Sequence, residues 1–397
     1  AGMPIEGAYV DINQDGIINP SDRYIYKKPD ADITMGFQTS MSYDNFDFGF
    51  NLRASIGNYM YNNVNSNRAQ YNLLQDVTAL GNIPVTVLES NFVETANVLI
   101  SDYYLENAES FLETKKIKTE NSESYVSYEP LGVVLGVMPW NFPFWQVFRF
   151  AVPTLTAGNT VVVKHASNVP KCATTIQTIF EEAGFPKGCY QNLPIPSNKV
   201  AEVIANPIIK AVSLTGSEQA GIAVATETGK HLKKCVLELG GNNAFIILED
   251  ANLEKAVASA VNARMQNAGQ SCIAAKRFLV QESIHDAFVY QFKVAVEKLK
   301  SGNPLNNDTQ IGSLARVDLA KELEIQVKKS IVMGAQLILG GNRNEAFFEP
   351  TILIQVTPEM PVFKEETFGP VAAITSFQTL DDAIKLSNQS DFGLGVS

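Results

Sequence analysis

The sequence predicts an α/β fold with a doubly wound parallel sheet and a second α/β domain, preceded by a β-hairpin-rich segment of unrelated type. From about residue 125, short apolar runs alternate with segments of helical periodicity, as in a parallel sheet with helices on both faces. Residues 33–56 instead alternate with a period of two. The 397 residues are 45% hydrophobic and 18% charged, which is enough apolar material for two or three globular domains.

Composition argues against several classes of function. A net charge of -11 leaves no basic face for phosphates, so no nucleic-acid partner is expected. No apolar run is long enough for a transmembrane helix, and no secretory signal is present. The four cysteines lack C-x-x-C spacing and form no zinc pattern with the three scattered histidines. Such sparse thiols favour a reducing compartment, the cytoplasm, for the α/β part.

Residues 33–43 and 46–56 predict a β-hairpin. Apolar side chains alternate with small or polar ones in both runs, and Asp44 and Asn45 supply a short polar turn. One apolar face opposite one small and polar face fits a lipid-facing barrel hairpin. The same pattern fits a hairpin of a soluble β-sandwich, and the alternation leaves both interpretations open.

Residues 11–22 have the spacing of an EF-hand-like calcium loop. Oxygen-bearing side chains occupy positions 1, 3, 5, 9 and 12, namely Asp11, Asn13, Asp15, Asn19 and Asp22. The last is shorter than the usual bidentate Glu, and no helical pattern flanks the loop. An Asx-rich turn explains the segment equally well, and no other metal site is expected.

The α/β part can be divided into elements in chain order. Strands are predicted at 132–140, 160–167, 208–217 and 233–241, and helices at 171–186 and 218–232. Parallel sheets bind ligands at the carboxyl ends of their strands. Gly216 and Ser217 form the turn at the end of the third of these runs, directly before the helix at 218–232. Their turn is not G-x-G-x-x-G, but amides at a helix N-terminus suit a pyrophosphate.

Four phrases carry most of the functional information: "MPWNFPFWQ" (138–146), "LELGGNN" (237–243), "NAGQSCIAAKRF" (267–278) and "FKEETFGPVA" (363–372). In this order and spacing they resemble the NAD(P)-dependent aldehyde dehydrogenase superfamily, from about residue 107 to 397. "VVKHASNVP" and "PWNFPFWQVFRFAVP" are most similar to its succinate-semialdehyde dehydrogenase branch. The resemblance implies an NAD(P)-binding domain at 107–239, with a bridging strand at about 112–130, and a catalytic domain at 240–397.

The resemblance also assigns catalytic roles for oxidation of a small-molecule aldehyde to its acid. Cys272, in "GQSC", is the expected nucleophile and would pass through a thiohemiacetal and a thioester. Glu238 is the expected general base for the hydrolysis. The Asn141 side chain and the backbone amide of Cys272 would bind the oxyanion. The other three cysteines are interpreted as packing residues.

Cofactor contacts are implied at several further positions. Many NAD-preferring relatives carry Glu three residues after the Lys that matches Lys164, whereas this chain has Ser167. A carboxylate would repel a 2′-phosphate and a serine would not, so NADP is favoured and NAD stays open. The remaining implied cofactor residues are Trp140, Gly216, Ser217, Gly240, Glu366 and Phe368.

Substrate choice depends on Arg149. At this place the succinate-semialdehyde branch carries an Arg whose guanidinium binds the far carboxylate of the substrate. The alternative is a surface Arg on an amphipathic helix. A second carboxylate-binding Arg of some relatives aligns with Gln266, and Arg264 is expected to point to another helical face. Half of that carboxylate pocket is therefore absent.

The N-terminal quarter, residues 1–106, resembles the C-terminal barrel part of SusC-like, TonB-linked outer-membrane receptors. The stretch "SDYYLENAESFL" (101–112) fits both resemblances and is the expected junction. Both ends look cut, and the C-terminal arm that pairs subunits in the family is missing, so the family's homo-oligomer would be compromised. Two alternative functions follow: an inactive chimera of receptor and dehydrogenase fragments, or a fragment of an outer-membrane glycan-import receptor.

Overall fold

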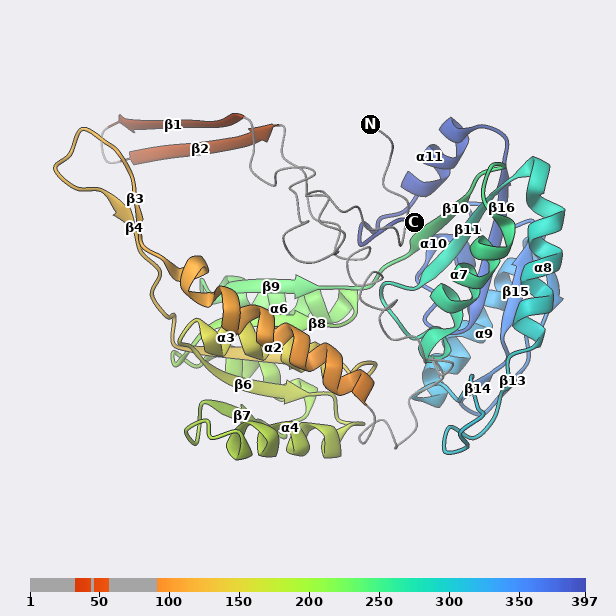
Figure 1. Ribbon diagram of the computed structural model, residues 1–397, viewed down its shortest axis with the longest axis horizontal. Helices are drawn as coiled ribbons and strands as arrows, with labels where there is room; N and C mark the ends of the chain where they lie inside the picture. Colours follow the sequence, from red (N-terminus) through yellow and green to blue (C-terminus); the bar gives the residue numbers. More distant parts are fainter. Residues whose placement is uncertain (1–32, 44–45, 57–90) are drawn as a thin grey trace, which may run out of the picture. The chain divides into compact units, whose positions relative to one another are not determined.

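The computed structural model describes residues 33–43, 46–56 and 91–397, with side chains described from residue 100 onward. The chain divides into two compact units, residues 1–78 and 79–397. In the first unit, β1 (Ile33–Tyr43) pairs antiparallel with β2 (Phe46–Ile56) (Figure 1). The register sets Phe37 opposite Leu52 and Met41 opposite Phe48. The predicted hairpin is therefore confirmed, whereas the calcium-loop candidates at 11–22 lie outside the described residues.

The first sheet of the second unit is parallel and five-stranded. Its strands, in chain order, are β5 (Val133–Met138), β6 (Thr160–His165), β7 (Tyr190–Asn192), β8 (Ile209–Thr215) and β9 (Lys234–Glu238). Their spatial order is β7-β6-β5-β8-β9, so the winding direction reverses between β5 and β8. This is the predicted doubly wound arrangement. Only β7 escaped prediction, because three residues carry no readable periodicity.

Helices cover both faces of this sheet. One face packs against α3 (Trp145–Thr156) and α4 (Pro170–Glu182), and the other against α5 (Val200–Ala205) and α6 (Glu218–Lys230). A 3₁₀ turn, η3 (Ser197–Lys199), leads into α5. Strand β6 is buried on both sides because successive side chains alternate. Val161 and Val163 pack with α3 and α4, whereas Val162 packs with the α5–α6 cluster.

The segment before this sheet consists of one helix and two short strands. Helix α2 (Asn91–Leu112) runs without a break through residues 106 and 107, where the domain boundary was predicted, and it contacts α3 (Figure 1). The bridging strand predicted at about 112–130 is reduced to a two-residue ladder, β3 (Lys115–Lys116) with β4 (Tyr125–Val126). Both short strands are exposed to solvent along their whole length.

The second sheet has the order β10-β11-β16-β15-β12. Its strands are β10 (Asn243–Ile247), β11 (Ala275–Gln281), β12 (Gln336–Leu339), β15 (Thr351–Ile354) and β16 (Val371–Phe377). Only β12 is antiparallel to its neighbour. A small hairpin joins β13 (Arg343–Asn344) to β14 (Phe347–Phe348). The predicted α/β character of this part is confirmed.

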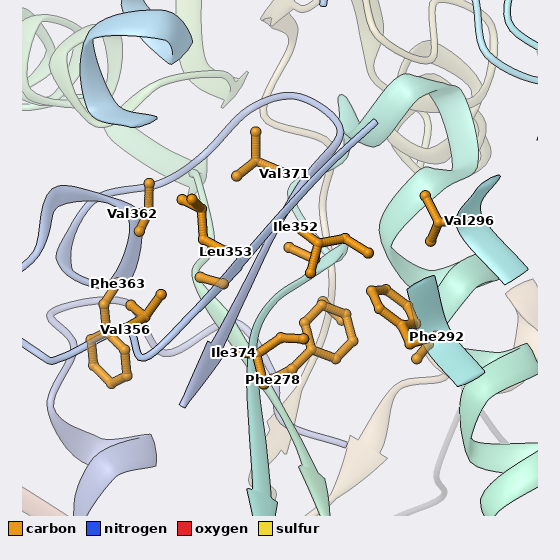
Figure 2. Close-up of a cluster of buried hydrophobic side chains, with 14 of the residues drawn as sticks. Phe278, Phe292, Val296, Ile352, Leu353, Val356, Val362, Phe363, Val371 and Ile374 are labelled. Carbon is orange, nitrogen blue, oxygen red and sulfur yellow. The ribbon is translucent and has the colours of Figure 1, made fainter. Parts of the chain in front are cut away.

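Helices surround the second sheet. They are α7 (Leu253–Met265), α8 (His285–Glu297), α9 (Val317–Val332), α10 (Pro361–Lys364) and α11 (Leu380–Asn388), with 3₁₀ turns η4 (Gln266–Gly269) and η5 (Glu282–Ile284). Figure 2 shows Ile352 beside Phe278 and Phe292, whereas Leu353 lies on the side of Val362. Alternate residues of β15 thus fill opposite sides of the core. Within the described part of the chain, no helix combines the length and apolarity needed to cross a bilayer.

Candidate active site

The predicted site residues of the first sheet lie at the carboxyl ends of its strands. Asn141 follows β5, Ser167 follows β6, and Ser217 follows β8. Glu238 is the last residue of β9. Parallel strands end at one edge of a sheet, so these residues share that edge although almost 100 positions separate the first from the last.

Cys272 follows a turn of unusual backbone conformation after α7. Asn267, Ala268 and Gly269 all have positive φ, at 53°, 51° and 74°. L-residues avoid this region, so neighbouring contacts must hold the turn. A Cβ on Gly269 would collide with the backbone carbonyl of Gly369, which makes glycine necessary there. The turn directs the chain back toward the second sheet and leaves Cys272 partly buried.

Arg264 holds this turn from inside. Its side chain is fully buried, and its guanidinium donates to the carbonyl oxygens of Gly269 at 2.7 Å and Gly369 at 2.5 Å. It also donates to Ala275 O at 3.1 Å. Burial lowers the pKa of Arg264 to about 9, which still leaves it charged at neutral pH. Arg264 therefore supports, from the interior, the loop 266–272, called the nucleophile loop after the predicted role of Cys272. Its buried side chain is no substrate ligand. Gln266 is exposed.

Asn141 joins the two halves of the site. Its Nδ2 donates to Gln270 O at 3.2 Å, and the Nδ2 of Asn267 donates to Asn141 O at 2.9 Å. Gln270 Oε1 in turn accepts the backbone N–H of Ala315 at 2.9 Å. These bonds set the predicted oxyanion-binding amide against the loop that ends in Cys272.

The Cys272 thiol lies among charged groups of both signs. Burial raises the pKa of Cys272, and the positive charges of Lys276 and Arg149 oppose that effect. The carboxylate of Glu366 acts in the same direction as burial. The net effect is a raised pKa, which favours the protonated thiol.

Arg149 extends from α3 to the end of β9. Its Nη1 lies 3.4 Å from Glu238 Oε2, and its Nη2 lies 3.4 Å from Thr215 Oγ1. Its charge also acts on Cys272. The guanidinium of Arg149 therefore contacts a predicted catalytic carboxylate, and the side chain is 35% exposed.

Glu366 packs against the glycines that follow β9. Its Oε1 accepts the backbone N–H of Gly241 at 3.0 Å and the Lys276 ammonium at 2.9 Å. A Cβ on Gly240 would overlap Glu366 Oε2, so this close approach requires glycine. Phe368, two residues on, stacks edge-on against Trp140 with ring centroids 5.7 Å apart. The structure thus brings these predicted cofactor residues together.

The region after β6 and β8 fits a phosphorylated cofactor. The Lys164 side chain is 8% exposed, and burial lowers its pKa. Among the residues that the structure describes, none forms an ion pair or hydrogen bond with its ammonium. A buried cation without a partner is suited to an anionic ligand. Ser217 caps α6 by accepting the Ala220 N–H at 3.3 Å, and Ser167 is exposed nearby in sequence.

Two residues in this region escaped sequence analysis. Lys276 is fully buried beside Cys272 and Glu366, and its position four residues after a cysteine carries no recognisable signal. His165 is buried and donates from Nε2 to Pro143 O at 3.0 Å, while its Nδ1 accepts the Ala166 N–H at 2.9 Å. It thereby ties the segment after β6 to the loop after β5. Within the described residues, no cluster of His, Cys, Asp and Glu could hold a metal ion.

Asn141 and Glu238 lie at the carboxyl ends of parallel strands, and Cys272 lies on the loop between η4 and β11. Residues 84–397 match the model of the aldehyde dehydrogenase family. The chain belongs to the aldehyde dehydrogenase family. The match begins at residue 84, so it includes 23 residues that sequence analysis placed with the N-terminal segment.

Relatives of known name support the same family. A probable succinate-semialdehyde dehydrogenase [NADP(+)] of Synechocystis sp. is 46% identical over 318 residues, which are 79% of this chain and 69% of that protein. A succinate semialdehyde dehydrogenase [NAD(P)+] of Escherichia coli is 44% identical over 317 residues, 79% of this chain and 68% of that protein. The family prediction is confirmed, and the chain is an NAD(P)-dependent aldehyde dehydrogenase by family.

Solved structures of other proteins are similar to this chain in fold. The succinic semialdehyde dehydrogenase of Streptococcus pyogenes, crystallised with NADP+ as the cofactor, has a TM-score of 0.74 and 36% identity. The similarity covers 76% of this chain and 67% of that one. The succinate-semialdehyde dehydrogenase of Burkholderia pseudomallei has a TM-score of 0.76 and 33% identity, over 82% of this chain and 68% of that one. The predicted aldehyde dehydrogenase fold is confirmed.

Proposed function

We propose that this chain oxidises succinate semialdehyde to succinate with NADP+ as the preferred acceptor. The observation that carries the substrate proposal is the position of Arg149, whose guanidinium contacts Glu238 inside the site. A guanidinium binds a carboxylate through two parallel hydrogen bonds, so it selects aldehydes with an acid group at the far end. The named relatives support the same substrate.

Cys272 is the proposed nucleophile. Its thiol would give its proton to solvent water, and the thiolate would add to the aldehyde carbon, forming a carbon–sulfur bond and a negatively charged oxygen. Asn141 Nδ2 carries two hydrogens, of which one already donates to Gln270 O at 3.2 Å, so the second can donate to this oxygen. The backbone N–H of Cys272 is the second proposed donor. A bound nicotinamide would supply the acceptor for the hydride of the former aldehyde carbon.

Glu238 is the proposed base for hydrolysis of the resulting thioester. It would take a proton from a water molecule as that water attacks the acyl carbon, and the sulfur of Cys272 would leave. In this structure Glu238 is paired with Arg149 at 3.4 Å. A substrate carboxylate on Arg149 would compete for the same guanidinium, so binding the correct substrate would release Glu238 for its task.

The cofactor proposal uses the residues at the strand ends. Lys164 and Ser167 would receive the 2′-phosphate of the adenosine ribose, because a cation without a partner among the described residues lies there and no carboxylate repels it. Gly216 and Ser217, at the N-terminus of α6, would face the pyrophosphate. The remaining proposed contacts, on the nicotinamide side, are Trp140, Gly240, Glu366 and Phe368.

Domain limits and assembly are likewise proposals. We propose an NAD(P)-binding domain at 107–239 and a catalytic domain at 240–397, as the two separate sheets support. A reducing, cytoplasmic setting is consistent with four unpaired cysteines. A family-type homo-oligomer stays a prediction, as does the receptor resemblance of residues 1–106. The comparisons do not support the alternatives of an inactive chimera or of a receptor fragment.

The test is formation of NADPH by the purified full chain with succinate semialdehyde. Cys272→Ala should reduce the rate by more than about a thousandfold, because the covalent route is lost. Cys189→Ala, at a half-buried loop cysteine outside the site, should retain the wild-type rate. A folded wild-type chain without turnover, or an active Cys272→Ala variant, would contradict the proposed function.

A further inference from the structure

We propose that Lys276 is a positioning residue that orients the Glu366 carboxylate toward the cofactor and links it to the nucleophile loop. The proposal rests on the proposed function in one respect, since it takes Glu366 as a cofactor-binding group. It adds a residue that neither the sequence motifs nor the family comparisons assign.

The ammonium of Lys276 has a complete set of partners. It donates to Ser271 O at 3.0 Å, to Cys272 O at 3.0 Å and to Glu366 Oε1 at 2.9 Å. An ammonium has three hydrogens, so all of its donor capacity is used. Its side chain is fully buried, and a buried cation persists only with partners of this kind. Lys276 therefore joins the backbone of the nucleophile loop to Glu366.

Glu366 is held by one oxygen only. Its Oε1 accepts both the Lys276 ammonium and the Gly241 N–H, and among the described residues none donates to Oε2. Oε2 lies where a Cβ on Gly240 would be, so the carboxylate faces the glycine turn after β9. An anchored Oε1 leaves Oε2 in a fixed direction as an acceptor for hydroxyl groups. A ribose diol of the cofactor has the matching chemistry.

The charges around Lys276 give the proposal a distinctive signature. Glu366 and Arg264 act on Lys276, while Lys276, Arg149 and Glu366 act on the Cys272 thiol. Lys276 lowers the pKa of Cys272 and Glu366 raises it. Removing one member of the Lys276–Glu366 pair should therefore shift the thiol in one direction, and removing the other should shift it in the opposite direction. A residue that only fills space would not produce opposite shifts.

The first experiment measures alkylation of Cys272 by iodoacetamide against pH in the cofactor-free full chain, with the modified cysteine identified by peptide mass spectrometry. Lys276→Met should raise the alkylation midpoint by about one pH unit, and Glu366→Gln should lower it. The double variant should lie close to wild type. Shifts of the same sign, or no shift in Lys276→Met, would overturn the proposal.

The second experiment measures NADP+ binding through tryptophan fluorescence, since Trp140 lies against Phe368. Lys276→Met should weaken binding about tenfold, because Glu366 loses its orientation. Lys300→Met removes a lysine paired with Asp308 at the surface and should leave the affinity unchanged. Unchanged binding in Lys276→Met would contradict the proposed orientation. Neither experiment uses an aldehyde, so failure here is distinguishable from failure of the proposed oxidation.

If Lys276→Met does not fold, the pH dependence of NADP+ binding by the wild-type chain tests the proposal instead. Burial lowers the pKa of Lys276 to about 8, against the opposing effect of Glu366. NADP+ binding should therefore weaken as pH rises through about 8, when the ammonium becomes neutral. Lys164→Met should retain this transition although it binds NADP+ less tightly. Its loss in Lys164→Met would assign the transition to Lys164 and overturn the proposal.

Discussion

Arg149 Nη1 lies 3.4 Å from Glu238 Oε2, and both side chains are partly exposed, at 35% and 43%. An ion pair of this length and exposure contributes little stability. A substrate carboxylate can therefore displace Glu238 from the guanidinium at low cost. The contact connects two roles that sequence analysis assigned separately, recognition of the substrate and activation of water.

The first prediction concerns Arg149→Met. The KM for succinate semialdehyde should rise by about 10- to 100-fold, because a charge-assisted hydrogen bond to the carboxylate is lost. The KM for an uncharged aldehyde such as propanal should change much less. Steady-state kinetics with the two aldehydes measure this difference. Equal effects on both substrates would indicate that Arg149 acts on Glu238 alone.

The second prediction concerns the cofactor phosphate. Ser167→Glu should weaken NADP+ binding at least about tenfold and affect NAD+ little, since a new carboxylate would repel the 2′-phosphate near Lys164. Ser167→Ala is the matched control, because it removes the hydroxyl without adding charge. Fluorescence titrations with both dinucleotides provide the measurement. Similar NADP+ affinities in the two variants would argue against a phosphate at this position.

The third prediction is an acid-dependent loss of stability through His165. Burial, followed by the nearby charge of Lys164, lowers the pKa of His165 below its ordinary 6.5, although the hydrogen bond to Pro143 opposes this. The unfolded chain then binds more protons than the folded one just below pH 6.5. The His165 contribution is therefore present above that pH and is lost as pH falls through the folded-state value. Melting temperatures should fall more steeply with acid in wild type than in His165→Gln, and parallel curves would count against this account.

The fourth prediction concerns the interior of the nucleophile loop. Arg264→Met should destabilise the protein by about 3–5 kcal/mol, because several buried carbonyls lose their donor. Arg316→Met breaks an exposed pair with Asp318 and should cost no more than about 1 kcal/mol. Urea unfolding of both variants provides the comparison. Equal urea midpoints for the two variants would mean that the turn at 267–269 is stable without the hydrogen bonds from Arg264.

Sequence patterns predicted the strands of the first sheet well, because β5, β6 and β8 are buried on both faces and read as continuous apolar runs. The proposed site residues were chosen from phrases that resemble a family, and four of them, Asn141, Ser167, Ser217 and Glu238, lie at strand ends in the structure. Lys276 and His165 were not found, because their importance depends on partners that are distant in sequence, such as Glu366 at 90 positions and Pro143 at 22. The bridging strand at about 112–130 was implied by the resemblance alone and stays a prediction, and the structure forms the two-residue strands β3 and β4 in that stretch.

The hydrogen bond between His165 and Pro143 has a consequence for protein engineering. The proposed cofactor-phosphate residue Ser167 follows β6, and the proposed oxyanion residue Asn141 follows β5, so the two are separate in the sequence. The imidazole of His165 connects the segment after β6 to the loop after β5 by hydrogen bonds. A redesign of residues 164–167 for another cofactor preference will therefore also change kcat, unless the hydrogen bond from His165 to Pro143 O is retained.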